Sequence, residues 1–188
     1  MRAIDKRLVE HEAGVFLSPM SMAKEQIFWT GSKAVEPRPL SLWLEPVITI
    51  GALAFLHEKF SWPETNLGLQ SKRRWSFDLV GYTNDLEREP LLCEVKKTDA
   101  EIEVLIEYMR CYCTRAPDST EPSNKIRQNA YRKVQDIRIA WPEYVWVLGP
   151  AGKGAVFQID RTDETELFEM TSVDESCLGF KSLMDRIS

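Results

Sequence analysis

Apolar and polar positions divide the chain into helices and short strands. The run Val47–Leu56 is almost wholly apolar, which predicts a helix over Leu42–Phe60 that is buried on most sides. Pro46 suits the first turn of this helix, and Pro63 follows its end. The sequence therefore predicts a buried helix that precedes the strands.

Two strands are expected next, with a third, weaker one before them. Trp75–Tyr82 and Leu91–Lys96 are rich in β-forming residues, and the polar stretch Thr83–Glu89 between them is typical of a hairpin. Asn66–Gln70 is the weaker candidate. Asp78 stands in the middle of the first of these predicted strands, among apolar neighbours.

Two helices follow the strands. Thr98 and Glu101 form a capping box, so a helix is expected directly after Lys96 and Lys97. A polar loop separates it from a second helix over Ser123–Ala140. Strands are then predicted at 144–148 and 155–159, joined by a glycine-rich hairpin turn at 149–154.

The two ends of the chain are expected to lie outside this core. Residues 1–40 are predicted to form a peripheral arm with one helix near Met22–Trp29, and residues 160–188 an acidic segment with a short helix near Cys177–Ile187. The core is then 41–159 of a single domain of 188 residues. The order of elements predicts an α/β fold in which a mixed sheet lies between helices.

The composition of the chain argues against several classes of function. No apolar run reaches the length of a membrane span, and the charged N-terminus lacks the apolar stretch of a signal peptide, so a cytoplasmic protein without a membrane partner is expected. The four cysteines do not have the paired spacing of a zinc site, and reduced thiols are expected. The net charge is −5, but residues 160–188 alone hold eight acidic and three basic side chains, so the remaining chain is neutral. A generic, charge-driven nucleic-acid binder is disfavoured.

One group of residues forms a candidate catalytic site. Glu94 and Lys96 alternate along one predicted strand and therefore project from the same face, while Val95 packs on the other. If the preceding strand pairs with it as a hairpin, Asp78 reaches Glu94 across the ladder. Two carboxylates and an ammonium then converge beside a capped helix start, and such oxygen donors suit Mg²⁺.

Asp78 with Glu94-Val95-Lys96, set between an upstream and a downstream helix, resembles the PD-(D/E)xK nuclease superfamily, which has the restriction-endonuclease-like fold. The resemblance covers roughly residues 42–159. It implies an αβββαβ core, dependence on a divalent metal, and phosphodiester hydrolysis, with Asp78, Glu94 and Lys96 as catalytic residues. The chain departs from the family pattern at Phe77, where proline is usual.

The same resemblance implies a ligand set for Mg²⁺ or Mn²⁺. Asp78, Glu94 and the backbone carbonyl of Val95 are the expected ligands, and a glutamate of the first core helix is expected to join them. Glu45 is the best candidate for that glutamate, and Glu58 is the second. The plainer interpretation stays open, namely a solvated ion pair of Glu94 and Lys96 on a strand face.

A basic helix offers a surface for nucleic acid. The helix over Ser123–Ala140 carries five basic residues against one acid, and a phosphate backbone can follow such a face. A solvated helix face explains the same charges. The residues expected to bind nucleic acid are Lys97, Lys125, Gln128, Arg132 and Lys133.

These observations predict a metal-dependent nuclease, with DNA favoured over RNA as substrate. A homodimer or a partner subunit for target recognition stays open. The alternative comes from another class: a non-catalytic domain of the same fold that binds a protein or a nucleic acid.

Overall fold

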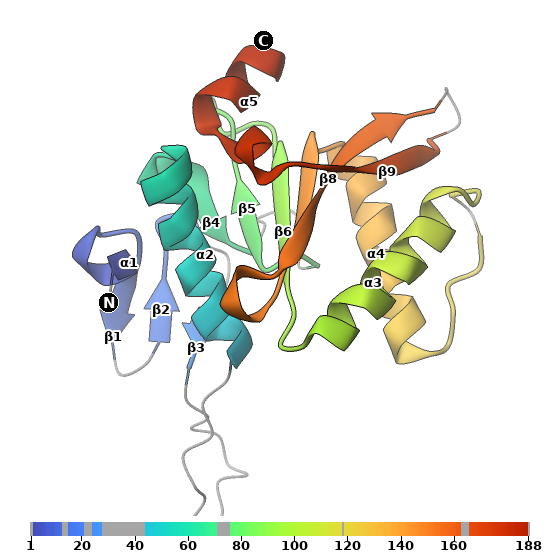
Figure 1. Ribbon diagram of the computed structural model, residues 1–188, viewed down its shortest axis with the longest axis horizontal. Coiled ribbons are helices and arrows are strands. Elements are labelled where there is room, and N and C mark those ends of the chain that lie inside the picture. The colour runs from blue at the N-terminus through green and yellow to red at the C-terminus, as the bar shows by residue number, and fades with distance from the viewer. Residues whose placement is uncertain are drawn as a thin grey trace, which may run out of the picture.

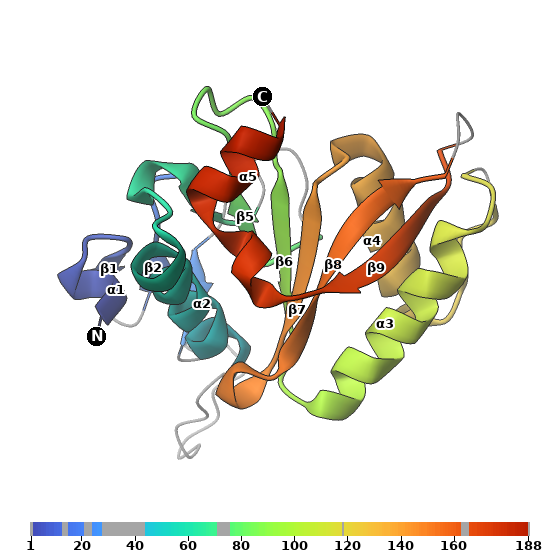
Figure 2. The same ribbon diagram turned by 45° about the horizontal axis from the view of Figure 1, so that its top comes forward.

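A six-stranded mixed sheet runs through the centre of the molecule, and helices cover both of its faces (Figures 1 and 2). The computed structural model describes residues 2–12, 15–20, 24–27, 44–70, 76–117, 119–162 and 166–187. The strands lie side by side in the order in which they occur in the chain: β4 (Leu67–Leu69), β5 (Leu79–Gly81), β6 (Leu91–Val95), β7 (Tyr144–Leu148), β8 (Gly154–Arg161) and β9 (Phe168–Val173).

All neighbouring strands of this sheet are antiparallel except one pair. β6 and β7 run parallel, with Leu91 opposite Tyr144. A parallel pair needs a crossover connection, and here α3 (Asp99–Cys113) and α4 (Lys125–Ala140) supply it. Both helices therefore lie on the same face of the sheet (Figure 1).

The opposite face of the sheet is covered by α2 (Leu44–Phe60). Successive side chains of a strand point to opposite faces, so β6 serves both layers. Cys93 and Val95 belong to the hydrophobic cluster under α2, whereas Leu92 belongs to the cluster under α3 and α4. This alternation places Glu94 on the face of α3 and α4.

Side-chain caps fix the starts of the two crossover helices. Thr98 Oγ1 accepts a hydrogen bond from the Glu101 amide, as the capping box predicts. Asn124 Oδ1 accepts from the amides of Ile126 and Arg127 and begins α4. The first cap starts α3 directly after the strand that holds Glu94, so the helix leaves the sheet beside that residue.

The remaining elements surround this core, and the last helix packs on the same hydrophobic cluster as α2. They are α1 (Arg2–Asp5), a small antiparallel sheet of β1 (Glu10–Glu12), β2 (Val15–Leu17) and β3 (Glu25–Gln26), the 3₁₀ turns η1 (Glu64–Asn66), η2 (Pro150–Gly152) and η3 (Glu175–Leu178), and α5 (Phe180–Ile187). None of the helices within the described ranges is long and apolar enough to cross a membrane.

The mixed sheet between helices confirms the predicted fold class at this level. Three details of the structure differ from the prediction. Where a helix was expected near Met22–Trp29, Glu25–Gln26 form a strand, and the rest of that range other than Lys24 and Ile27 lies outside the described residues. The acidic segment 160–188 contains a strand that was not predicted, since Phe168–Val173 extends the central sheet as β9. Asp78 lies one residue before β5 rather than in mid-strand.

Candidate active site

Asp78 extends the hydrogen-bonding ladder of the sheet although it precedes β5. Its amide donates to the Cys93 carbonyl at 3.0 Å, and its carbonyl accepts from the Gln70 amide at 2.9 Å. Because Leu79 lies opposite Cys93, the antiparallel register places Asp78 opposite Glu94. The Asp78 side chain reaches across, and its Oδ2 accepts a hydrogen bond from the Val95 amide at 2.7 Å.

Glu94 is the centre of the cluster and is buried, with 3% of its surface exposed. Each of its carboxylate oxygens faces a lysine. Lys96 Nζ lies 2.5 Å from Oε1, and Lys133 Nζ lies 2.5 Å from Oε2. The first lysine directly follows the same strand and the second comes from α4, so two layers of the fold converge on one carboxylate.

Lys96 stands between the buried cluster and solvent, with 18% of its side chain exposed. Its ammonium donates to the Val95 carbonyl at 3.1 Å as well as meeting Glu94. The Val95 carbonyl, expected as a metal ligand, is thus a hydrogen-bond acceptor for Lys96 in this structure. The backbone amide of Lys96 donates to the Leu148 carbonyl at 2.8 Å and continues the ladder with β7.

Burial and neighbouring charge set the protonation of these groups. Burial, and then the charge of Glu94, raise the pKa of Asp78 from 3.8 to about 8. The opposing effects of Lys133, of the Val95 amide and of Lys96 are smaller. Burial acts to lower the pKa of Lys96, but the nearby carboxylates, Glu94 foremost, outweigh it, and the pKa lies above its ordinary value. Lys96 is therefore a cation at neutral pH.

A pocket of about 430 Å³ opens beside Lys96. Its walls come from the start of α2, from α3 and from the first turns of α4. It is mixed in character, with apolar side chains among charged ones: Glu45, Lys96, Ala100, Glu101, Val104, Leu105, Lys125, Ile126 and Asn129. A ligand in this pocket contacts the candidate catalytic lysine directly.

Glu45 lies in the first turn of α2, as expected, and shares the pocket wall with Lys96. Its charge contributes to the raised pKa of Lys96. Glu58 does not share this position, because it lies near the other end of the 17-residue helix, where it pairs with Arg2 at 3.1 Å. Of the two candidate glutamates, the structure thus leaves Glu45 at the site.

Four of the five predicted nucleic-acid-binding residues are at least partly exposed, and one is buried. Lys97 and Arg132 are exposed and pair with Glu101 and Glu121. Lys125 is exposed beside the pocket, and Gln128 is partly exposed. The prediction for Lys133 was wrong, because its side chain is only 2% exposed and contacts Glu94 instead of facing solvent. The helix points it inward, in the same stripe as Ala130, Val134 and Ile137.

Sequence reasoning missed two contributors to the site and a third residue close to Glu45. Lys133 was assigned to the wrong face of its helix, although the spacing 130, 133, 134 and 137 is that of an inward stripe. The Ser76 carbonyl accepts a hydrogen bond from Lys133, and no sequence pattern marks a carbonyl. Glu25 lies near Glu45, and burial together with that charge raises the pKa of Glu25. It comes from the N-terminal sheet, which the sequence did not predict.

The carboxylates fit a divalent cation, within limits. Asp78 and Glu94 lie opposite each other and offer hard oxygen donors, and Mg²⁺ needs only one or two protein carboxylates when waters and substrate phosphates complete its shell. Within the described ranges, no group of three or more histidine, cysteine, aspartate or glutamate side chains is arranged to hold a metal ion. The chain thus offers a two-carboxylate site rather than a closed cage.

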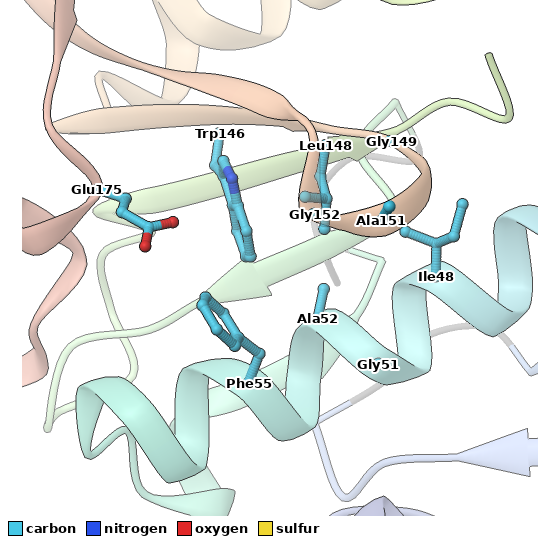
Figure 3. A pocket seen from close by; sticks show the side chains of 10 residues that line it. All are labelled: Ile48, Gly51, Ala52, Phe55, Trp146, Leu148, Gly149, Ala151, Gly152 and Glu175. Atoms are coloured by element: carbon cyan, nitrogen blue, oxygen red, sulfur yellow. The ribbon is translucent and has the colours of Figure 1, made fainter. Parts of the chain in front are cut away.

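Another cavity lies across the sheet from the site. It measures about 270 Å³ and is enclosed by α2, β7 and the turn at η2, with Phe55 facing Trp146 (Figure 3). The ring centroids of these two residues are 6.0 Å apart. Its walls are mainly apolar, and among the described residues that line it only Glu175 is ionisable. Asp78, Glu94 and Lys96 are not part of its lining.

Comparisons of the chain with protein-family models, with curated proteins and with solved structures find no match.

Proposed function

We propose that this protein is a metal-dependent nuclease of the restriction-endonuclease-like class. The observation that carries the proposal is the meeting of Asp78, Glu94 and Lys96 at the adjoining ends of β5 and β6, beside an open pocket. Burying charged groups costs free energy, and clusters of buried ionisable groups with perturbed pKa values are typical of functional sites. Their arrangement supports the role that the sequence resemblance implies.

The order of elements supports the same assignment. A helix, α2, precedes three antiparallel strands, β4 to β6, and two helices then lead to the parallel strand β7. This is the αβββαβ order implied by the resemblance, with one additional helix in the crossover. Asp78 and Glu94 occupy the second and third of these strands or their immediate ends, as that family pattern requires.

The residues divide the chemistry among themselves. Asp78 and Glu94 would hold Mg²⁺ or Mn²⁺, with Glu45 near enough to the pocket to contribute. When bound, such a cation supplies Lewis acidity toward a phosphate and acidifies water. Lys96, which lines the pocket, binds a phosphate oxygen and stabilises the negative charge that grows during hydrolysis. Glu94 orients the Lys96 ammonium through their 2.5 Å contact.

A different observation favours the non-catalytic alternative. Glu94 already meets two lysines, so its charge is balanced without a metal. A domain that had lost catalysis and kept the fold for binding could retain such an internally neutralised cluster. A cleavage assay separates the two functions.

The assay uses linear duplex, circular duplex and single-stranded DNA, together with RNA, in Mg²⁺ or Mn²⁺. It compares the wild type with Lys96→Ala and with Lys59→Ala. Lys59 is half-exposed in the last turn of α2 and pairs with Glu175, far along the helix from Glu45. Removing one donor to developing charge costs about 10²–10³ in rate. The Lys96 variant should lose that much, while the Lys59 variant retains the wild-type rate.

Two results would contradict a nuclease. Equal cleavage by the wild type and Lys96→Ala would assign the activity to a contaminant or to another site. Absence of cleavage on all four substrates, with the protein folded, would favour the binding domain.

A further inference from the structure

Lys133 is a buried cation in the middle of the candidate site. Only 2% of its side chain is exposed, and α4 carries it on its inward stripe. Its ammonium donates to the Ser76 carbonyl and to Glu94 Oε2, and it lies 4.7 Å from the centre of the Phe77 ring. These contacts direct the lysine toward the Asp78 end of the sheet.

Packing alone does not account for a lysine at this position. Its neighbours on the inward face of α4 are Ala130, Val134 and Ile137, which are fully buried. An apolar side chain of similar length would fill the same space without the cost of burying an ammonium group. The charge of Lys133 is therefore best explained by what it does to Glu94.

The cluster offers no excess negative charge. Even with both carboxyl groups ionised, Asp78 and Glu94 are matched by the two ammonium groups of Lys96 and Lys133. The further carboxylate of Glu45 shares the pocket wall with the ammonium of Lys125. A divalent cation approaching this cluster gains no attraction from its net charge. It also finds each oxygen of Glu94 already in contact with an ammonium. The cluster itself has no net negative charge to attract a cation. The phosphates of a bound nucleic acid supply that negative charge.

We propose that Lys133 is a positioning residue that holds Glu94 and keeps the site weak for divalent cations until a nucleic acid is bound. The inference rests on the proposed function and deepens it, because it couples metal loading to substrate. In this role Lys133 acts by holding Glu94 and does not contact the reacting atoms itself. Lys96, exposed to the pocket, remains the lysine that meets the phosphate.

The first test measures Mn²⁺ binding to the wild-type protein by titration calorimetry, with and without a short non-cleavable phosphorothioate DNA. Weak binding without DNA and an affinity at least about tenfold higher with it are expected, since a unit charge at close range changes a carboxylate equilibrium by one or more powers of ten. Equal affinities would overturn the inference. This comparison needs no variant and does not depend on how any substitution folds.

The second test repeats the titration without DNA on Lys133→Gln. The amide can still donate to Ser76 and Glu94 but carries no charge, so Mn²⁺ affinity should rise at least about tenfold. Lys133→Arg keeps the charge and should restore the weak binding. Arg127→Gln removes an exposed charge from the same helix and should leave the affinity unchanged.

The outcomes separate the inference from the proposed function. Unchanged Mn²⁺ affinity in a folded Lys133→Gln, in a protein that binds Mn²⁺ and cleaves nucleic acid, would overturn the role of Lys133 alone. Absence of Mn²⁺ binding under every condition would overturn the proposed function and this inference together.

Discussion

At the residue scale, burial controls the chemistry of Asp78. Its carboxyl lies opposite Glu94 and accepts a hydrogen bond from the Val95 amide. Burial first, and the Glu94 charge second, raise its pKa to about 8, so Asp78 is largely protonated at neutral pH in the metal-free protein. A cation beside this carboxyl would favour its ionised form.

This shift predicts a pH-dependent stability in the presence of EDTA. A carboxyl whose pKa is raised by folding stabilises the protein below its unfolded value of 3.8, and this stability is lost as pH rises toward about 8. Between pH 5 and 8 the wild type should lose stability relative to Asp78→Asn, by up to about 1.4 kcal/mol per pH unit. The amide of that variant does not titrate, and its oxygen can still accept a hydrogen bond from Val95.

Urea unfolding of both proteins at several pH values measures this difference. Parallel stability curves for the wild type and Asp78→Asn over that range would show that Asp78 ionises normally in the folded protein.

Much of the site could be predicted from the strands. The alternation of Glu94, Val95 and Lys96 fixes which side chains share a face, and the hairpin brings Asp78 opposite Glu94. The spacing 130, 133, 134 and 137 also places Lys133 on the inward stripe of its helix, but its positive charge favoured the solvated face. Glu25 could not be placed at all, since short strands such as Glu25–Gln26 carry little pattern.

At the element scale, α4 combines an inward stripe that includes Lys133 with an outward face that is open to solvent. Lys125 lies beside the pocket, and Arg132 is 61% exposed. The exposed face is the part of the predicted nucleic-acid surface that the structure leaves available. Its contribution is electrostatic and therefore sensitive to salt.

Replacing Lys125 and Arg132 together by glutamate should weaken binding to duplex DNA and reduce its salt dependence. Each basic residue that contacts a phosphate contributes about 0.9 to the slope of log affinity against log salt, so two contacts should remove about 1.8. Fluorescence anisotropy at several salt concentrations measures both quantities.

The matched control is Lys59→Glu with Lys181→Glu, which changes the net charge equally on exposed residues of α2 and α5. If both double variants lose the same affinity and slope, the effect belongs to overall charge and the outward face of α4 is only a solvated surface.

The strands at the ends of the chain show why some elements escaped prediction. β9 alternates buried Phe168 and Met170 with exposed Glu169 and Thr171, the period expected of a half-buried strand. The acidic residues around it favoured an acidic segment with one short helix instead. Pairing with β8 stabilises this strand. The pairing extends as far as Arg161, which lies opposite Phe168.

At the scale of the whole molecule, the sheet separates two hydrophobic clusters, one under α2 and one under α3 and α4. The site lies where the layers meet. Glu45 reaches it from α2, Lys133 reaches it from α4, and the sheet itself supplies Asp78, Glu94 and Lys96. Because both helical layers meet the sheet at this end, the carboxylates and Lys133 are buried. A pocket beside them stays open to solvent.

The most direct measurement of the central claim is the position of Mn²⁺ in crystals of Lys96→Ala with a bound oligonucleotide, located by its anomalous scattering. We expect a peak coordinated by the carboxylates of Asp78 and Glu94, with a phosphate oxygen of the oligonucleotide at the same ion and Lys133 still in contact with Glu94. An oligonucleotide bound with no peak at these carboxylates, or a peak at a different set of side chains, would contradict a metal-dependent nuclease site here.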